Sequence, residues 1–341
     1  MLNGDAIVTA HGRPLARPSV LPRLELAGLA CLALLPLVLE PFGTALVTRI
    51  LILAILAVSF DLVWGYAGIL SFGQALFFGA GAYAVALLGR DLDLAQGWLT
   101  LPAAALSGGI LAALVGWFLL LGRRPPSLVF VAIGTLAGSY AAERLVNASL
   151  YLGGRNGISG VPPIRLGPVE LFEGVGFYFL AFGTLAFVYL ACRLLVRSQL
   201  GLVLAGVRDA ERRLLFLGYR VARLKALVFG LSGAVAGLAG GLHAYHEGYV
   251  GPTGLGIELS TMVVLYVLLG GSGTLVGAVL GVIAIESLGH FLSDFSPRYW
   301  SMALGLLLLA VVVFRPSGLL GLVVSDRERV GRFGVPMPEE R

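Results

Sequence analysis

Long apolar runs separated by short polar segments make up most of the chain. Because about 20 apolar residues in a helix cross the hydrocarbon core of a membrane, the pattern predicts an all-α, polytopic transmembrane helical bundle of about eight to ten spans. The runs lie at 24–39, 45–65, 66–88, 98–121, 128–150, 174–196, 224–246, 256–270, 275–292 and 298–314.

Glycine-rich sequence interrupts the apolar pattern twice, at 71–74 and at 270–274. Helices broken by glycine in two halves of a membrane protein point to a transport site, so we expect broken helices at both places. The alternative interpretation is that these glycines only allow close packing of the helices.

Basic residues predict the orientation of the bundle. Segment 193–225 holds eight of the 24 basic residues, and positively charged loops stay in the cytoplasm. Counting spans outward from it places the Arg123–Arg124 turn inside, and the segments 90–96 and 151–173 outside. Separating the runs at 270–274 as two spans keeps the arginine-rich C-terminal tail inside as well.

The sequence predicts a single membrane domain with a tail at each end. We expect a cytoplasmic N-terminal tail at 1–23, a transmembrane domain at 24–322 and a cytoplasmic C-terminal tail at 323–341. A polar cytoplasmic loop at about 197–223 interrupts the membrane domain.

The composition excludes a soluble enzyme. The chain is 58% hydrophobic and 13% charged, with a mean hydropathy of +0.92, whereas soluble domains carry about 25% charged residues. The 48 glycines fit closely packed membrane helices. The net charge of +5 follows from orientation in the lipid bilayer and gives no indication of nucleic-acid binding. Cys31 and Cys192 lie in apolar runs and form no disulfide or metal-binding pattern.

The polar loop at 198–223 has its own pattern. Apolar and charged residues alternate in a helix-like order, which predicts a short amphipathic helix. Two interpretations of this helix are open: it lies on anionic lipid through its arginines, or another protein moves the bundle through it.

The chain has no phosphate-binding loop of its own. Its one lysine, Lys225, follows Leu224 and not the glycine of a Walker A motif. Energy for uphill transport therefore comes from a partner ATPase or from an ion gradient. An ion-coupled secondary transporter needs ionisable groups inside the bundle, and the candidates are Asp61, Glu143 with Arg144, and Glu286 with His290.

Two weak motifs resemble enzyme or metal sites. Gly230–Gly233 resembles the GxSG motif of intramembrane rhomboid proteases, with Ser232 as nucleophile and His290 as base. A second copy at 157–160, in a predicted external loop, indicates a chance match. His243, His246 and Glu247 form HxxHE and not the HExxH of metalloproteases. We therefore predict neither a catalytic residue nor a metal site.

Several short motifs follow one another in order between about residues 45 and 322. They are GYAG at 65–68, SFGQA at 71–75, FFGAGAY at 77–83, GGRNGI at 153–158, RDAE at 208–211 with Gly218–Tyr219, AGLAGGL at 236–242, GGSGTL at 270–275 and FRPSGLLGL at 314–322. In this order they resemble the integral permease subunits of ABC importers for branched-chain amino acids (LivM type) and for urea or short amides (UrtC type).

This resemblance implies partners and a mechanism. The chain would pair with a second permease of similar fold in the bacterial inner membrane. Two cytoplasmic ABC ATPases would bind ATP and Mg²⁺, and an external binding protein would deliver the solute. Transport would proceed by alternating access, and this chain itself would need no cofactor and do no covalent chemistry.

The resemblance also assigns residues to coupling. Part of the 201–218 segment looks like the EAA-type loop that docks in a groove of the ATPase. Arg212 and Arg213 stand where many relatives carry small residues, so the arginines would meet acidic groups of a specific ATPase. The residues assigned to coupling are Arg208, Asp209, Ala210, Glu211, Arg212 and Gly218.

Both helix breaks are expected to border the solute path. Exposed backbone groups and short polar side chains can hydrogen-bond a small polar solute, which selects Ser71, Gln74, Gly270, Gly271, Ser272 and Thr274. The solute itself stays open. Gln74 stands where many relatives carry His, and the sequences at 216–219, 273–279 and 297–300 look more like the urea branch than the leucine branch.

Overall fold

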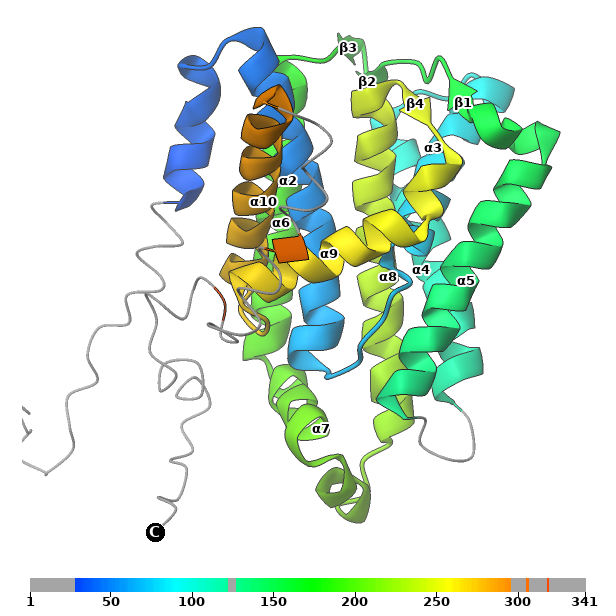
Figure 1. Cartoon of the computed structure of the whole chain (residues 1–341), viewed down its shortest axis with the longest axis vertical. Helices are drawn as coiled ribbons and strands as arrows, with labels where there is room; N and C mark the ends of the chain where they lie inside the picture. The colour runs from blue at the N-terminus through cyan, green and yellow to red at the C-terminus, as the bar shows by residue number, and fades with distance from the viewer. Residues whose placement is uncertain (1–27, 122–126, 296–304, 307–317, 319–341) are drawn as a thin grey trace, which may run out of the picture.

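The computed structural model describes residues 28–121, 127–295, 305–306 and 318 (Figure 1). It confirms the prediction of an all-α bundle of membrane-spanning helices. Within this part of the chain, six helices are long and apolar enough to span a membrane. They are α2 (Pro41–Asp61) with its π-helical extension η2 (Leu62–Tyr66), α3 (Gln74–Leu92), α4 (Gly97–Leu120), α5 (Leu128–Ala148), α6 (Val175–Arg197) and α8 (Val221–Glu247).

A bent pair of helices follows α8. Helices α9 (Ile257–Gly270) and α10 (Leu275–Phe295) meet at an angle of 113°. With 14 residues, α9 is about 21 Å long and too short for a hydrocarbon core of about 30 Å. The prediction that 256–270 is a full span of its own is therefore wrong. In Figure 1, α9 crosses the bundle at mid-height and α10 runs from there toward the end of the bundle at which the short strands lie.

Two further predicted runs give no long helix in the described structure. Of the run at 24–39, the described residues form the short apolar helix Gly28–Leu37, whose last turn is the 3₁₀ helix η1 (Leu35–Leu37). The run at 298–314 lies almost entirely outside the described residues. The run at 66–88 does not begin as a helix, because residues 67–73 are irregular and α3 starts at Gln74.

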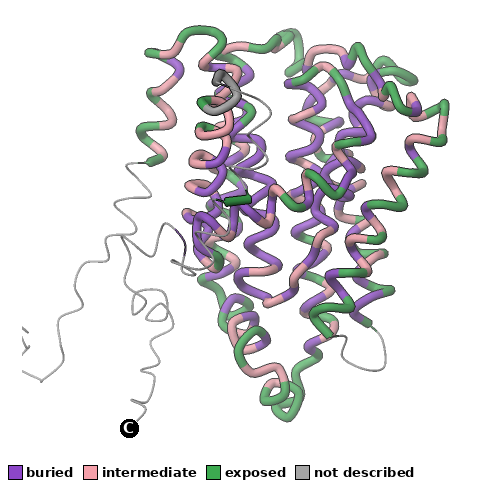
Figure 2. Tube along the Cα trace, in the orientation of Figure 1, coloured by how far each residue is buried: buried purple, intermediate pink, exposed green. Residues whose placement is uncertain are grey.

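Helix α2 is the centre of the bundle. The apolar 18-residue stretch that makes it a candidate membrane span is 83% buried inside the protein. The helix packs against α6, α8 and α10. The corresponding apolar stretches of α4, α5 and α6 are only 33%, 28% and 33% buried. Figure 2 shows exposed residues along these outer helices. Their exposed apolar side chains, such as Trp117, Phe118 and Phe187, suit contact with lipid or with another apolar chain.

Glycines allow α8 to approach α3 and α4 closely. A Cβ atom on Gly237 would lie 2.4 Å from the carbonyl oxygen of Ala104, and one on Gly240 would lie 1.8 Å from the carbonyl oxygen of Phe78. Neither position has room for a side chain. The glycine content therefore serves helix packing, as expected where membrane helices associate through small residues.

Short polar elements lie at the two ends of the bundle. Strand β1 (Ile158–Ser159) pairs antiparallel with β4 (Tyr249–Val250), and β2 (Ile164–Leu166) forms a hairpin with β3 (Val169–Leu171). These strands lie at one end, whereas helix α7 (Gln199–Phe216) lies at the other (Figure 1). The remaining 3₁₀ turns are η3 (Leu150–Leu152), η4 (Gly154–Asn156) and η5 (Pro252–Leu255). The loops predicted to lie on opposite sides of the membrane are thus separated by the length of the bundle.

The tight contact between α8 and α4 gives a stability prediction. Gly237→Ala places a methyl group against backbone atoms of α4, so we expect a loss of about 1–3 kcal/mol and a lower unfolding temperature of the purified full-length protein in detergent. The matched control is Gly183→Ala, because Gly183 is exposed in α6 and a Cβ there meets nothing within 4 Å. An equal effect of both substitutions would contradict the packing argument.

Candidate functional site

The polar loop predicted at 198–223 contains the helix α7. Ser198 caps its start, because the Ser198 hydroxyl oxygen accepts a hydrogen bond from the Leu200 amide at 3.2 Å. The backbone is not helical at Ala210, with φ −150° and ψ 57°, so α7 consists of two helical parts joined by a kink. The amphipathic helix is confirmed, and the kink is a feature that the sequence did not predict.

Gly218 ends this segment in a left-handed conformation, with φ +84°. The Gly218 amide donates to the Leu215 carbonyl at 3.1 Å, and the Tyr219 amide donates to the Leu214 carbonyl at 3.0 Å. These bonds satisfy carbonyls that the end of a helix leaves unpaired. A glycine is favoured here because other residues pay a steric cost at positive φ.

The far end of α7 is both apolar and basic. Phe216 is 91% exposed and Leu217 is 73% exposed, and the side chains of Arg212 and Arg213 are exposed beside them. Such a tip suits contact with a protein surface that has an apolar groove and acidic groups.

Two charged residues of α7, Glu211 and Arg208, bond to other parts of the bundle. The Lys225 ammonium on α8, of which 9% is exposed, donates to Glu211 Oε1 at 2.8 Å. The Arg208 guanidinium pairs through Nε with Asp209 at 2.9 Å and donates through Nη1 to the Gly65 carbonyl at 2.6 Å. Both Arg208 and Glu211 thus have partners within this chain.

The second helix break touches the end of α2 and η2, next to the first break, beside Arg208. The buried Asp61 carboxylate accepts a hydrogen bond from the Gly273 amide at 2.7 Å, and a Cβ on Gly65 would lie 2.4 Å from the Gly273 nitrogen. A Cβ on Gly273 would lie 3.3 Å from Arg208 Nη1, and one on Gly68 would lie 2.9 Å from Arg208 Cγ. Arg208 therefore lies against both breaks at once.

Side chains from distant helices satisfy the backbone of the first break. The Phe72 amide donates to the Thr135 hydroxyl at 3.0 Å, and the Ser139 hydroxyl donates to the Phe72 carbonyl at 3.2 Å. The Ala75 amide donates to the Ser260 hydroxyl at 3.3 Å. Backbone groups at membrane depth need such partners, so α5 and α9 hold this break in place.

The residues predicted for the solute path all lie at these breaks. Ser71, Gln74, Gly270, Gly271 and Thr274 are buried, and Ser272 is exposed. The Ser71 hydroxyl accepts from the Gly73 amide at 3.1 Å, and the Thr274 hydroxyl donates to the Gly271 carbonyl at 2.8 Å. Their part in the solute path stays a prediction.

Gln74 belongs to a buried hydrogen-bond chain. Its side-chain amide donates to the Ser232 hydroxyl at 3.0 Å, and that hydroxyl donates to the Ser59 carbonyl at 2.7 Å. Ser232 therefore joins α8 to α2 and α3. Its hydroxyl proton goes to a backbone carbonyl and not to a histidine, which gives no support to a nucleophilic role.

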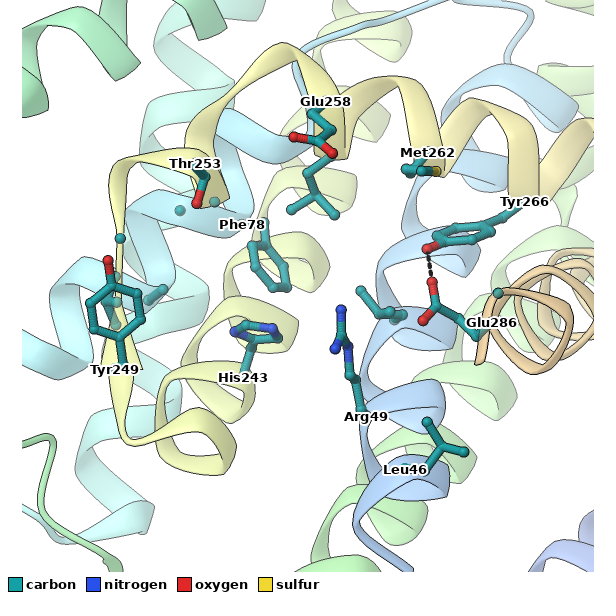
Figure 3. Close-up of a pocket in the computed structure, with 18 of the residues that line it drawn as sticks. Leu46, Arg49, Phe78, His243, Tyr249, Thr253, Glu258, Met262, Tyr266 and Glu286 are labelled. Atoms are coloured by element: carbon teal, nitrogen blue, oxygen red, sulfur yellow. Dashed lines mark hydrogen bonds between the residues drawn. The ribbon is translucent and has the colours of Figure 1, made fainter. Parts of the chain in front are cut away.

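A cavity of about 510 Å³ opens between α2, α3, α8, α9 and α10 (Figure 3). The six residues predicted for the solute path are not among those that line it. Tyr266 donates a hydrogen bond to Glu286 at its edge. Its lining includes one arginine, two histidines and two glutamates: Arg49, His243, Glu258, Glu286 and His290.

Arg49 and Glu258 are not among the residues predicted from the sequence. Arg49 is the one basic residue in the apolar run at 45–65, and this isolation was the available signal. Among the described residues, no three His, Cys, Asp or Glu side chains group as metal ligands.

Comparisons with known proteins agree on the kind of protein. The family model described as the branched-chain amino acid transport system / permease component matches residues 44–312. The chain is 30% identical to the high-affinity branched-chain amino acid transport system permease protein LivM of Escherichia coli K12, over 89% of this chain and 76% of the relative. It is 29% identical to the autoinducer 2 import system permease protein LsrC of Escherichia coli O157:H7, over 79% of this chain and 84% of the relative. No solved structure matches the chain significantly.

These matches and the apolar helices confirm the prediction of a multi-pass inner-membrane protein with a transport role. The family model covers well over half of the chain. The chain therefore belongs to the family of branched-chain amino acid transport system permease components.

Proposed function

We propose that this chain is one permease subunit of an ATP-driven ABC importer that takes up branched-chain amino acids. An external binding protein delivers the solute, a second permease of similar fold completes the pathway, and two cytoplasmic ATPase subunits bind ATP and Mg²⁺. The LivM relative is named for branched-chain amino acid transport, which supports this solute. Urea or a short amide is the second candidate, supported by the motifs of the urea branch in the sequence.

The contact of Arg208 with both helix breaks is the observation that carries the proposal. Arg208 belongs to α7, at the end of the bundle where the positive-inside rule puts the cytoplasm. Its guanidinium holds the Gly65 carbonyl and lies against Gly273. A displacement of α7 by an ATPase therefore acts directly on the two places where the membrane helices are interrupted.

Alternating access follows from this connection. Helices α9 and α10 form a bent pair, and α2 and α3 are separated by the irregular residues 67–73. Such interruptions are the places where transporters change shape around a solute. Rocking of the two permease subunits would open the cavity of Figure 3 first to one side of the membrane and then to the other.

The tip of α7 is the proposed docking site for the ATPase. Phe216 and Leu217 would enter an apolar groove, and Arg212 and Arg213 would meet acidic residues at its rim. Glu211 is committed to Lys225 in this chain. We therefore assign it to fixing the angle of the tip against α8.

The opposite end of the bundle is the proposed docking surface for the external binding protein. Its hairpin carries the exposed ion pair Arg165–Glu170, at 2.8 Å. Beside α5, the Tyr151 hydroxyl donates to Asp91 at 2.5 Å, and this hydrogen bond raises the pKa of Tyr151. Arg90 lies over the Tyr151 ring, 4.6 Å from its centroid. The surface is thus rich in fixed charges that can orient a partner.

Co-purification tests the subunit assignment. A tagged chain extracted from native membranes in mild detergent is expected to bring down two ATPase subunits and a second apolar permease, identified by mass spectrometry. The same complex in proteoliposomes should take up solute only with ATP. A chain that purifies alone and transports with an ion gradient would instead establish the ion-coupled secondary transporter.

Replacing Arg208 tests the coupling path. Arg208→Ala removes the bond to the Gly65 carbonyl and leaves the tip of α7 intact, so the ATPases should still bind and hydrolyse ATP. We expect the amount of solute transported per ATP hydrolysed to fall about tenfold, as expected for loss of a charge-assisted hydrogen bond. The matched control is Arg197→Ala, because Arg197 is exposed at the end of α6. An unchanged ratio in Arg208→Ala would contradict the role of this residue.

A further inference from the structure

Arg49 is an unusual residue for the central helix of a membrane bundle. It is the ninth residue of α2, about 12 Å along the helix from Pro41, and the residues that follow it from Ile50 to Asp61 are all buried. Its own side chain is exposed. In the described part of the chain, no side chain forms a hydrogen bond or an ion pair with its guanidinium.

A guanidinium at this depth needs water or an anion as its neighbour. Charged side chains within membrane spans are costly and mark the paths of solutes and ions. Arg49 lines the cavity of about 510 Å³, and Figure 3 shows its side chain extending from α2 into this space. Because the guanidinium is planar and always charged, it binds a carboxylate through two parallel hydrogen bonds.

An acidic group enters the same cavity from another helix. Glu286 projects from α10, and the Tyr266 hydroxyl on α9 donates a hydrogen bond to one of its carboxylate oxygens. Figure 3 shows Glu286 and Arg49 reaching toward the cavity from different helices. The distance between them exceeds that of an ion pair, since no pair joins them in the described structure. Neither charge is therefore already neutralised by direct pairing with the other.

The rest of the wall combines apolar side chains with the polar side chains of His243, Tyr249, Thr253, Glu258 and His290. Leu46, Leu53, Phe78 and Met262 line the cavity, and its volume lies within the range of about 300–1,000 Å³ typical of small-molecule sites. Apolar surface beside the Arg49 cation and the carboxylates of Glu286 and Glu258 complements a zwitterion with an aliphatic side chain. A neutral amide such as urea leaves both charges without partners, which a buried site disfavours.

We propose that this cavity is a transit site of the permease for a zwitterionic amino acid, in which Arg49 binds the α-carboxylate and Glu286, positioned by Tyr266, binds the α-ammonium. This inference rests on the proposed import function and makes it more specific. It places part of the selection for solute in the permease itself, in addition to the external binding protein.

Direct binding to the purified importer without its external binding protein tests this proposal. The probes are radiolabelled L-leucine, leucinamide, which lacks the carboxylate, and 4-methylpentanoate, which lacks the ammonium group. We expect the wild-type importer to bind L-leucine at least about tenfold more tightly than leucinamide, because leucinamide leaves Arg49 without its anion. Arg49→Gln should bring this ratio close to one.

Two further variants separate the roles of the charges. Glu286→Gln should weaken binding of L-leucine and leucinamide alike and leave 4-methylpentanoate unchanged. Arg144→Gln is the matched control, because Arg144 is exposed on α5 and lies outside the cavity. It should keep the wild-type ratio. Each ratio compares two probes on the same protein, so it does not depend on the fraction that folds.

An unchanged ratio in Arg49→Gln, or a wild-type importer that binds none of the three probes, would overturn the proposal. Tight binding of urea that is insensitive to Arg49→Gln would overturn it as well. The import function is judged separately, by ATP-dependent uptake in proteoliposomes that contain the external binding protein. Uptake in that assay combined with an unchanged ratio would therefore reject the transit site alone.

Discussion

Backbone groups inside a membrane must find hydrogen-bond partners within the protein, and this requirement governs the centre of the bundle. Both helix interruptions leave amides and carbonyls that no helix satisfies. Thr135, Ser139 and Ser260 supply partners for the first break, and Asp61 supplies one for the second. Each break is therefore held by side chains from other helices, and the bundle cannot change shape at one break without disturbing those helices.

The same requirement joins the interior of the bundle to α7. The Gly65 carbonyl, next to the first break, accepts its hydrogen bond from Arg208. Glycines at 65, 68 and 273 leave the space for this approach, since a Cβ at any of them would crowd Arg208 or the neighbouring backbone. One guanidinium thus completes the polar centre of the bundle and attaches it to the helix proposed to meet the ATPase. In our account, coupling and structural stability depend on the same bonds.

Sequence patterns were sufficient for the architecture at the level of elements. Apolar length predicted the long helices, glycine-rich sequence predicted both breaks, and mixed charge and apolarity predicted α7. The run at 256–270 was already short for a span, and hydropathy did not predict the 113° bend between α9 and α10, because apolar content carries no information on direction. It also did not predict the kink at Ala210, which lies between Arg208 and Glu211, two residues that contact distant parts of the chain.

The residues of the candidate site, like the fold, could be predicted from the sequence only in part. Polar groups concentrate at the breaks in the sequence, and the structure shows them hydrogen-bonded within the breaks and to side chains of other helices. The residues that line the cavity come from five long helices and from the segment of β4 and η5, and Arg49 and Glu258 are each the one charged residue of their kind in their apolar runs. Only the tertiary arrangement brings Arg49 near Glu286 and Tyr266, so no spacing rule along the chain could identify that cluster.

Hydrogen–deuterium exchange of the assembled importer tests the link between α7 and the helix breaks most directly. Exchange would be followed by mass spectrometry with and without a non-hydrolysable ATP analogue, in peptides that cover α7, residues 65–75 and residues 270–275. Our account predicts that nucleotide changes exchange in all three regions together, because Arg208 and Asp61 join them. A change confined to α7, with both breaks unaffected, would contradict it.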